Sequence, residues 1–188
     1  MNDLEKSILK TLAFFDVFSY PLTAEEIFKW LYRPNDSYTL LAVKKALKDS
    51  QNLKGELSLT EAFYSLKGRE YTAYIRKKNN NIAERKFYKA IRMIKMYRLI
   101  PFVRMVAVCN TLAYSNAREG SDIDLFIITR RGQIWLARFF TILLVKFLGK
   151  RPNEEDHTDT FCLSFFVDED HLNIEKINIH GKDIYTPY

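Results

Sequence analysis

The feature of this sequence that most constrains its fold is a pair of acids at the entrance of an apolar run. Asp122 and Asp124 flank Ile123, and the residues that follow are apolar as far as Ile128. Side chains two positions apart in a β-strand project to the same face. The two carboxylates are therefore predicted to lie side by side, while Ile123 enters the core. Such a pair suits Mg²⁺, which prefers oxygen ligands and also binds phosphates. An ordinary exposed pair of aspartates is the alternative.

The residues after Pro101 predict a small mixed α/β sheet. Strands are expected at residues 102–109, 123–129 and 161–167, a crossover helix at 132–149, and a possible fourth strand at 172–179. Strands joined by a long helical crossover are typical of such a sheet. Four apolar residues of the crossover helix are interpreted as core: Trp135, Phe139, Phe140 and Leu144.

The first seventy residues predict three helices and a hairpin. The second helix opens at a capping box, Thr23–Glu26, and the third is expected at residues 39–49. Strand-like runs at 53–59 and 62–66 predict a two-stranded wing, so the outline is that of a winged helix-turn-helix. Three lysines lie on the exposed side of the third helix: Lys44, Lys45 and Lys48. They indicate either contact with the DNA backbone or an ordinary solvated face.

The fold class is therefore predicted as α+β, with three segments. Residues 1–70 form the winged-helix-like domain, residues 71–100 a basic connecting helix, and residues 101–188 the mixed-sheet domain. An interruption of the connecting helix is expected at the three asparagines 79–81. The last residues resemble the start of another element, which suggests a longer parent protein.

Charge and composition indicate the cellular location of the protein more clearly than its function. The net charge of +6 favours polyanionic partners, although it also fits simple solubility. Cys109 and Cys162 lie in apolar runs, which predicts buried, reduced thiols and a cytoplasmic protein. The apolar stretch 134–148 is too short for an ordinary membrane span and contains Arg138 and Lys146, so no membrane segment is expected.

The run from Val106 to Thr129 resembles the nucleotidyltransferase superfamily, which has a polymerase-beta-like fold. That family has a Gly-Ser pair after its first strand and, further along, two acids that flank a hydrophobic residue at the start of the second. In this chain Asn110-Thr111 occupies the Gly-Ser place, and Asp122 and Asp124 match the acids. Asn110 departs from the family because its side chain adds bulk where a phosphate would bind.

The resemblance implies a Mg²⁺-dependent enzyme that transfers a nucleoside monophosphate from an NTP, with ATP as the expected donor, to an unknown hydroxyl. Asp122 and Asp124 would hold the metal. The family's third carboxylate lies on the third core strand, so Asp159 is the candidate general base or third ligand, with Asp156 second. An ordinary loop aspartate is the alternative for Asp159. Phosphates would be bound by residues of the preceding loop: Asn110, Thr111, Arg118 and Ser121. Arg118 as a surface residue and Ser121 as a loop cap are the alternatives.

A second hypothesis is a transferase-like domain that has lost catalysis. Such a domain would act as a nucleotide sensor or interaction module beside a winged-helix domain. Nucleotide and DNA, the latter through residues 1–70, are then the expected partners, and a homo-oligomer is left open. Asn110 in the glycine place motivates this hypothesis.

Overall fold

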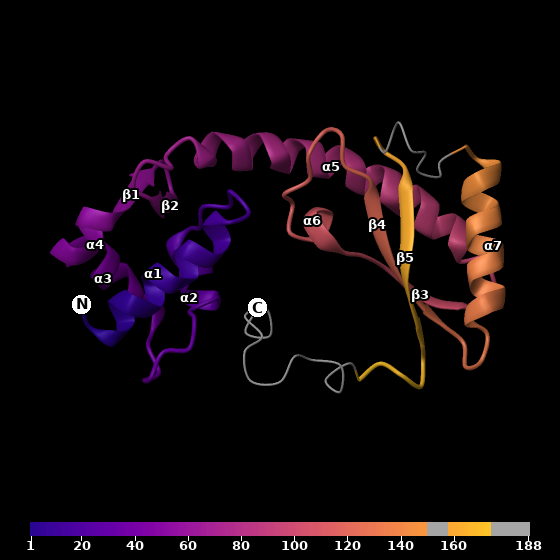
Figure 1. Cartoon of the computed structure of the whole chain (residues 1–188), viewed down its shortest axis with the longest axis horizontal. Coiled ribbons are helices and arrows are strands. Elements are labelled where there is room, and N and C mark those ends of the chain that lie inside the picture. The colour runs from indigo at the N-terminus through magenta and orange to yellow at the C-terminus, as the bar shows by residue number, and fades with distance from the viewer. Residues whose placement is uncertain (150–157, 174–188) are drawn as a thin grey trace. The chain divides into compact units, whose positions relative to one another are not determined.

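The computed structural model describes residues 1–149 and 158–173 (Figure 1). Its fold is α+β, as predicted. The chain divides into two compact units, of which one comprises Met1–Lys78 and the other begins at Asn79. The division falls inside helix α5 (Thr72–Tyr97), which lies within the segment expected to connect the two domains.

The first unit combines four helices with a hairpin. Its elements are α1 (Asp3–Asp16), α2 (Ala24–Lys29), α3 (Leu40–Asp49), α4 (Gln51–Glu56), β1 (Leu57–Thr60) and β2 (Phe63–Leu66). Asn2 and Thr23 form capping boxes that start α1 and α2, and β1 pairs antiparallel with β2. Its core consists of Leu4, Ile8, Leu12, Leu22, Ile27, Val43, Leu47 and Leu53.

One element of this unit differs from its prediction. The wing strand was expected to begin at Leu53, but residues up to Glu56 belong to helix α4. The Ser50 hydroxyl accepts a hydrogen bond of 3.2 Å from the Leu53 backbone N–H and so caps this helix. Leu53 enters the helical core from α4. The spacing of four from Leu53 to Leu57 fits a helix, and the spacing of two from Leu57 to Leu59 fits a strand, so this short segment did not distinguish the two.

The second unit contains the sheet. Its elements after α5 are β3 (Val103–Val108), α6 (Asn110–Ala113), β4 (Ile123–Thr129), α7 (Ile134–Phe147) and β5 (Phe161–Asp168). The strand order is β3-β4-β5, with β3 antiparallel and β5 parallel to β4 (Figure 1). The three predicted strands and the crossover helix are confirmed. The possible fourth strand at 172–179 lies almost entirely outside the described residues.

Helix α5 continues through residues 79–81, so the predicted interruption there is wrong. Asn79 is buried, and its side-chain amide donates a hydrogen bond of 2.8 Å to Asn116 Oδ1. An asparagine costs a helix at most about 0.7 kcal/mol relative to alanine. Packing of the rest of the helix outweighs that cost, since Ile82, Ala83, Ala90, Met93 and Tyr97 all belong to the core.

The side chains of strand β4 point alternately to the two faces of the sheet. Its residues alternate between buried and half-buried, and Ile123, Leu125 and Ile127 all face the core that α5 and α7 help to form. Asp124 therefore faces the opposite side of the sheet from α5. The predicted orientation of this strand is confirmed.

Helix α7 contradicts the interpretation of its aromatic residues as core. Trp135 is 80% exposed, Phe139 60% and Phe140 41%. Leu144, the fourth residue of that prediction, does pack against the core. The residues that it buries are instead small: Ala137, Thr141 and Val145. Because nearly every position of the helix is apolar, periodicity could not indicate which side faces the sheet. Across residues 1–149 and 158–173, every helix is too short or too polar to cross a membrane.

Candidate functional site

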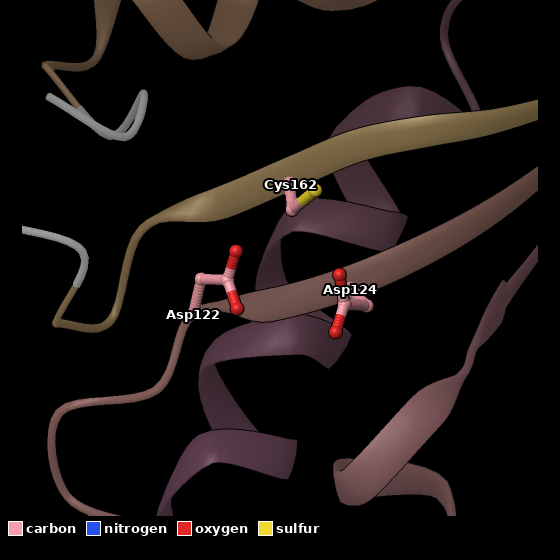
Figure 2. Close-up of side chains that lie close together, drawn as sticks. All are labelled: Asp122, Asp124 and Cys162. Carbon is pink, nitrogen blue, oxygen red and sulfur yellow. The ribbon is translucent and has the colours of Figure 1, made fainter. Parts of the chain in front are cut away.

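Three potential ligand side chains meet where β4 and β5 begin. In the parallel register Ile123 pairs with Phe161, and Asp124 pairs with Cys162. One ligand atom from each of Asp122, Asp124 and Cys162 lies within 4.8 Å of the others. Figure 2 shows the three side chains on one side of the strands, with a helix behind. The predicted proximity of the two aspartates is therefore observed, and Cys162 joins them.

Cys162 was not among the predicted site residues. The signal that could have found it is the alternation of side chains along a strand. Phe161 is buried in the core, so the next residue, Cys162, must face the side on which Asp124 lies. Because Cys162 lies in an apolar run, its sequence context predicted only a buried, reduced thiol.

Asp159 is close to the site but does not belong to the same ligand group. It lies in the turn before β5, with a left-handed backbone φ of +57°. Its carboxylate forms an ion pair of 3.2 Å with Lys86 Nζ and a second ion pair with Lys89. The structure groups Asp122 and Asp124 with Cys162, and not with Asp159 as expected. Asp156, the second choice, lies outside the described residues.

The two lysines also determine the acidity of Asp159. Partial burial alone would raise the pKa of its carboxyl, but hydrogen bonds from Lys89 and Lys86 outweigh this effect. The pKa of Asp159 is therefore lowered, and the carboxylate is ionised at neutral pH. A carboxylate with a lowered pKa is a weak proton acceptor.

Lys86 is buried, and it connects the two chain segments that lead into the site. Besides Asp159, its Nζ donates to the backbone oxygens of Glu119 at 3.1 Å and Ser121 at 2.5 Å. A buried ammonium is stable only when such partners replace water. Sequence reasoning placed this lysine among the many cations of a basic helix and missed its role.

The loop before β4 contains the predicted phosphate-binding residues. Asn110 adopts a left-handed φ of +54°, a conformation that favours glycine. Thr111 is half-buried, and its backbone oxygen accepts a hydrogen bond of 2.8 Å from the Asn116 N–H. The Ser121 hydroxyl donates to the Arg118 backbone oxygen at 2.8 Å. This bond is a loop cap, as one of the two interpretations of Ser121 predicted, and Arg118 is exposed.

Cys109 and Cys162 form no disulfide, and both are half-buried, not buried as predicted. Cys109 directly follows β3, and its backbone N–H donates to the backbone oxygen of Asp124 at 3.1 Å. Burial raises the pKa of the Cys109 thiol to about 11, and the charges of Asp124 and Cys162 add to this effect. The Cys109 thiol is therefore protonated at neutral pH.

The residues at the site fit a divalent cation, but not equally well at every position. The carboxylates of Asp122 and Asp124 are hard oxygen ligands of the kind that Mg²⁺ prefers. The thiol of Cys162 is a soft ligand, which suits zinc or other transition metals better than Mg²⁺. The cluster thus combines two oxygen ligands with a third group of different chemistry.

No protein-family model, curated protein or solved structure matches this chain. The geometry of the aspartate pair and its loop is therefore the evidence on which a function can be proposed.

Proposed function

We propose that the chain is a Mg²⁺-dependent nucleotidyltransferase that moves a nucleoside monophosphate from an NTP, with ATP as the expected donor, to a hydroxyl acceptor. The observation that supports this proposal is the pair Asp122 and Asp124, side by side at the start of β4 on the face opposite the core. The pair follows a polar loop that returns from an antiparallel strand.

Asp122 and Asp124 would hold Mg²⁺, which when bound neutralises phosphate charge and stabilises the attacking and leaving oxygens of the displacement. The left-handed backbone of Asn110 supports its match with the glycine of the related motif, because both residues reach this conformation more readily than most. Thr111 follows with a hydroxyl and a backbone N–H, both of which can donate to a phosphate.

A second candidate function is a nucleotide sensor or interaction module without catalysis. Two observations favour it. Asp159 is paired with Lys86 and Lys89 and is thereby made less basic. The residue of the third core strand that faces Asp124 is Cys162, where the resemblance implies a carboxylate. Both positions therefore favour a domain without catalysis.

The sensor candidate includes DNA binding by residues 1–70. Lys45 and Lys48 are exposed on α3, whereas Lys44 forms an ion pair of 2.6 Å with Glu25. Contacts between these lysines and the phosphate backbone of DNA would make the binding tolerant of DNA sequence and sensitive to salt. A gel-shift assay at low salt tests this, with Lys45→Glu/Lys48→Glu against Lys10→Glu on α1 as the control. Equal retardation by all three proteins, or none by the wild type, removes this part of the candidate.

Titration calorimetry of ATP with and without Mg²⁺ tests nucleotide binding. We expect binding by the wild type in the presence of Mg²⁺ and its loss in Asp122→Asn/Asp124→Asn. Glu169→Gln, which removes a carboxylate at the far end of β5, is the matched control and should bind normally. Binding that is identical in the wild type and the double variant would reject the site itself.

Release of pyrophosphate separates the two candidate functions. Incubation with ATP, Mg²⁺ and a panel of hydroxyl compounds should release pyrophosphate if the chain is a transferase. ATP binding that depends on Asp122 and Asp124 but is never followed by pyrophosphate release favours the sensor.

A further inference from the structure

The outward face of α7 is a continuous stripe of large apolar side chains. Trp135, Phe139 and Leu143 follow one another at intervals of four residues, so they lie on one side of the helix. Phe147 continues the stripe and is 86% exposed. Single exposed apolar residues are common on protein surfaces, but a contiguous group of this kind marks an interaction site.

The stripe borders a groove between α7 and the end of α5. The groove has a volume of about 430 Å³, and its lining is apolar. Its principal lining residues are Met96, Leu99, Ile100, Phe140, Leu143 and Phe147. Leu99 is 80% exposed, so the groove is open along the α5 side. The second unit therefore presents both a ridge and a hollow that another apolar element could fill.

The charged residues of the two segments that form this surface have one sign. Residues 85–100 contain six lysines or arginines and residues 130–149 contain four, and neither stretch contains an aspartate or glutamate. Lys95, Arg98 and Lys146 are exposed and adjoin groove-lining residues in the sequence. Within the described part of the chain, the ion pairs of these two stretches involve Arg85, Lys86, Lys89 and Arg131, not these three cations. An occupant with acidic flanks would complement them.

We propose that this groove and ridge bind an amphipathic helix whose apolar face is flanked by aspartate or glutamate. The exposed stripe from Trp135 to Phe147 is about 18 Å long, which corresponds to between three and four helical turns. A helix laid in an apolar groove is a recurrent mode of recognition, in which residues at intervals of three and four provide the anchors. This site is on the core side of the sheet and does not depend on the proposed transferase activity.

Charge and shape distinguish this occupant from two others. A second copy of the same surface would place Lys146 and its basic neighbours against identical cations, with no acid on α7 to compensate. A bilayer surface would meet the exposed ridge, but the concave groove beside it matches the side chains of a helix better than a plane.

A displayed library of amphipathic helical peptides, each of about five turns and randomised at its flanking positions, tests the proposal. We expect selection against the full chain to enrich peptides with acidic flanks. A synthesised peptide from the selection should shift the fluorescence of Trp135, and Trp135→Phe should remove that signal. Its affinity should fall at least about tenfold in Leu143→Gln/Phe147→Gln, and similarly in Lys95→Glu/Lys146→Glu. These residues are exposed, so the variants should fold normally.

Leu41→Gln is the matched control, because it removes an exposed leucine from the other unit and should leave peptide binding unchanged. Failure to enrich peptides, or enrichment without acidic flanks, overturns the proposal. It is also overturned if the Leu143/Phe147 variant binds the selected peptide as well as the wild type does. If the wild type sediments with phosphatidylcholine and phosphatidylserine vesicles and that variant does not, the occupant is a bilayer instead. If the wild type dimerises and that variant does not, the occupant is a second copy.

Discussion

The Nζ atom of Lys86 lies 2.5 Å from the backbone oxygen of Ser121, the residue directly before Asp122. The same atom donates to the Glu119 oxygen and to the Asp159 carboxylate. One buried lysine on α5 thus connects the loop that enters β4 with the turn that enters β5. Because the candidate metal ligands follow these two segments, we expect Lys86 to position them.

Lys86→Met keeps the aliphatic part of the side chain and removes its three donors. We expect the free energy of unfolding to fall by about 1–3 kcal/mol, since buried acceptors lose their partner. Mn²⁺, used as a probe of the Asp122–Asp124 site, should bind about 10–100-fold more weakly, as is typical when a group that orients metal ligands is lost. Urea denaturation and titration calorimetry measure the two effects.

Lys89→Met is the matched control for this prediction. Lys89 also pairs with Asp159, but its side chain is 47% exposed. Its loss should cost less than about 1 kcal/mol of stability and should leave Mn²⁺ affinity unchanged. If both variants weaken Mn²⁺ binding equally, the connection from Lys86 to the β4 loop is not what positions the site.

Asp159 should make the free energy of unfolding depend on pH in the acidic range. Its pKa is lowered in the folded chain, so the unfolded chain takes up the proton first as pH falls. The stabilisation is therefore complete above the ordinary carboxyl pKa of about 3.9 and is lost as pH falls through the lower folded value. Urea unfolding from neutral pH to pH 3 should show the wild type more stable than Asp159→Asn near neutrality, with the two converging in acid. A constant difference at every pH would contradict this.

The strands of the sheet could be predicted because their burial follows the simplest sequence signal. Ile123, Leu125 and Ile127 alternate with residues of the other face, and the buried pattern of β4 repeats that alternation. Helix α7 lacked such an alternation of apolar and polar positions, because apolar residues lie on every side of it. The side that faces the core carries Ala137, Thr141 and Val145, which are smaller than the exposed aromatic residues.

The candidate site was only partly predictable for a related reason. Asp122 and Asp124 are close in sequence, so their relation needed only the geometry of a strand. Which residue lies beside the two aspartates as a third ligand depends on where β5 begins and on how it pairs with β4. Asp159 falls in a turn with a positive φ, and its carboxylate pairs with two lysines of α5 that are distant in sequence. No local pattern indicates such a partnership.

In the first unit, Arg76 should be more sensitive to substitution than its surface neighbours. Its two terminal nitrogens donate to the two carboxylate oxygens of Glu26 at 2.7 and 2.6 Å. Its guanidinium also lies 4.1 Å from the ring centroid of Tyr20 and 4.5 Å from that of Phe63. A lysine can reproduce neither the paired bonds nor the planar stacking.

We therefore expect Arg76→Lys to lower the free energy of unfolding by about 1–3 kcal/mol. Lys77→Ala, which removes an exposed ion pair with Glu61, should cost less than about 1 kcal/mol. Thermal and urea denaturation of both variants measure the difference. Equal stability of Arg76→Lys and the wild type would show that the paired geometry contributes nothing.

Replacing Cys162 by aspartate should convert the site into one with three carboxylates. Because charge and the number of oxygen ligands govern affinity for hard cations, we expect Cys162→Asp to bind Mg²⁺ about tenfold more tightly than the wild type. Without metal the same variant should be less stable, since three neighbouring carboxylates repel one another. Cys162→Ser, which removes the thiol without adding a charge, should show neither effect. Calorimetry with MgCl₂ and urea denaturation with and without the metal provide both measurements. Unchanged Mg²⁺ affinity in Cys162→Asp would mean that the side chain at this position does not face the cation bound by Asp122 and Asp124.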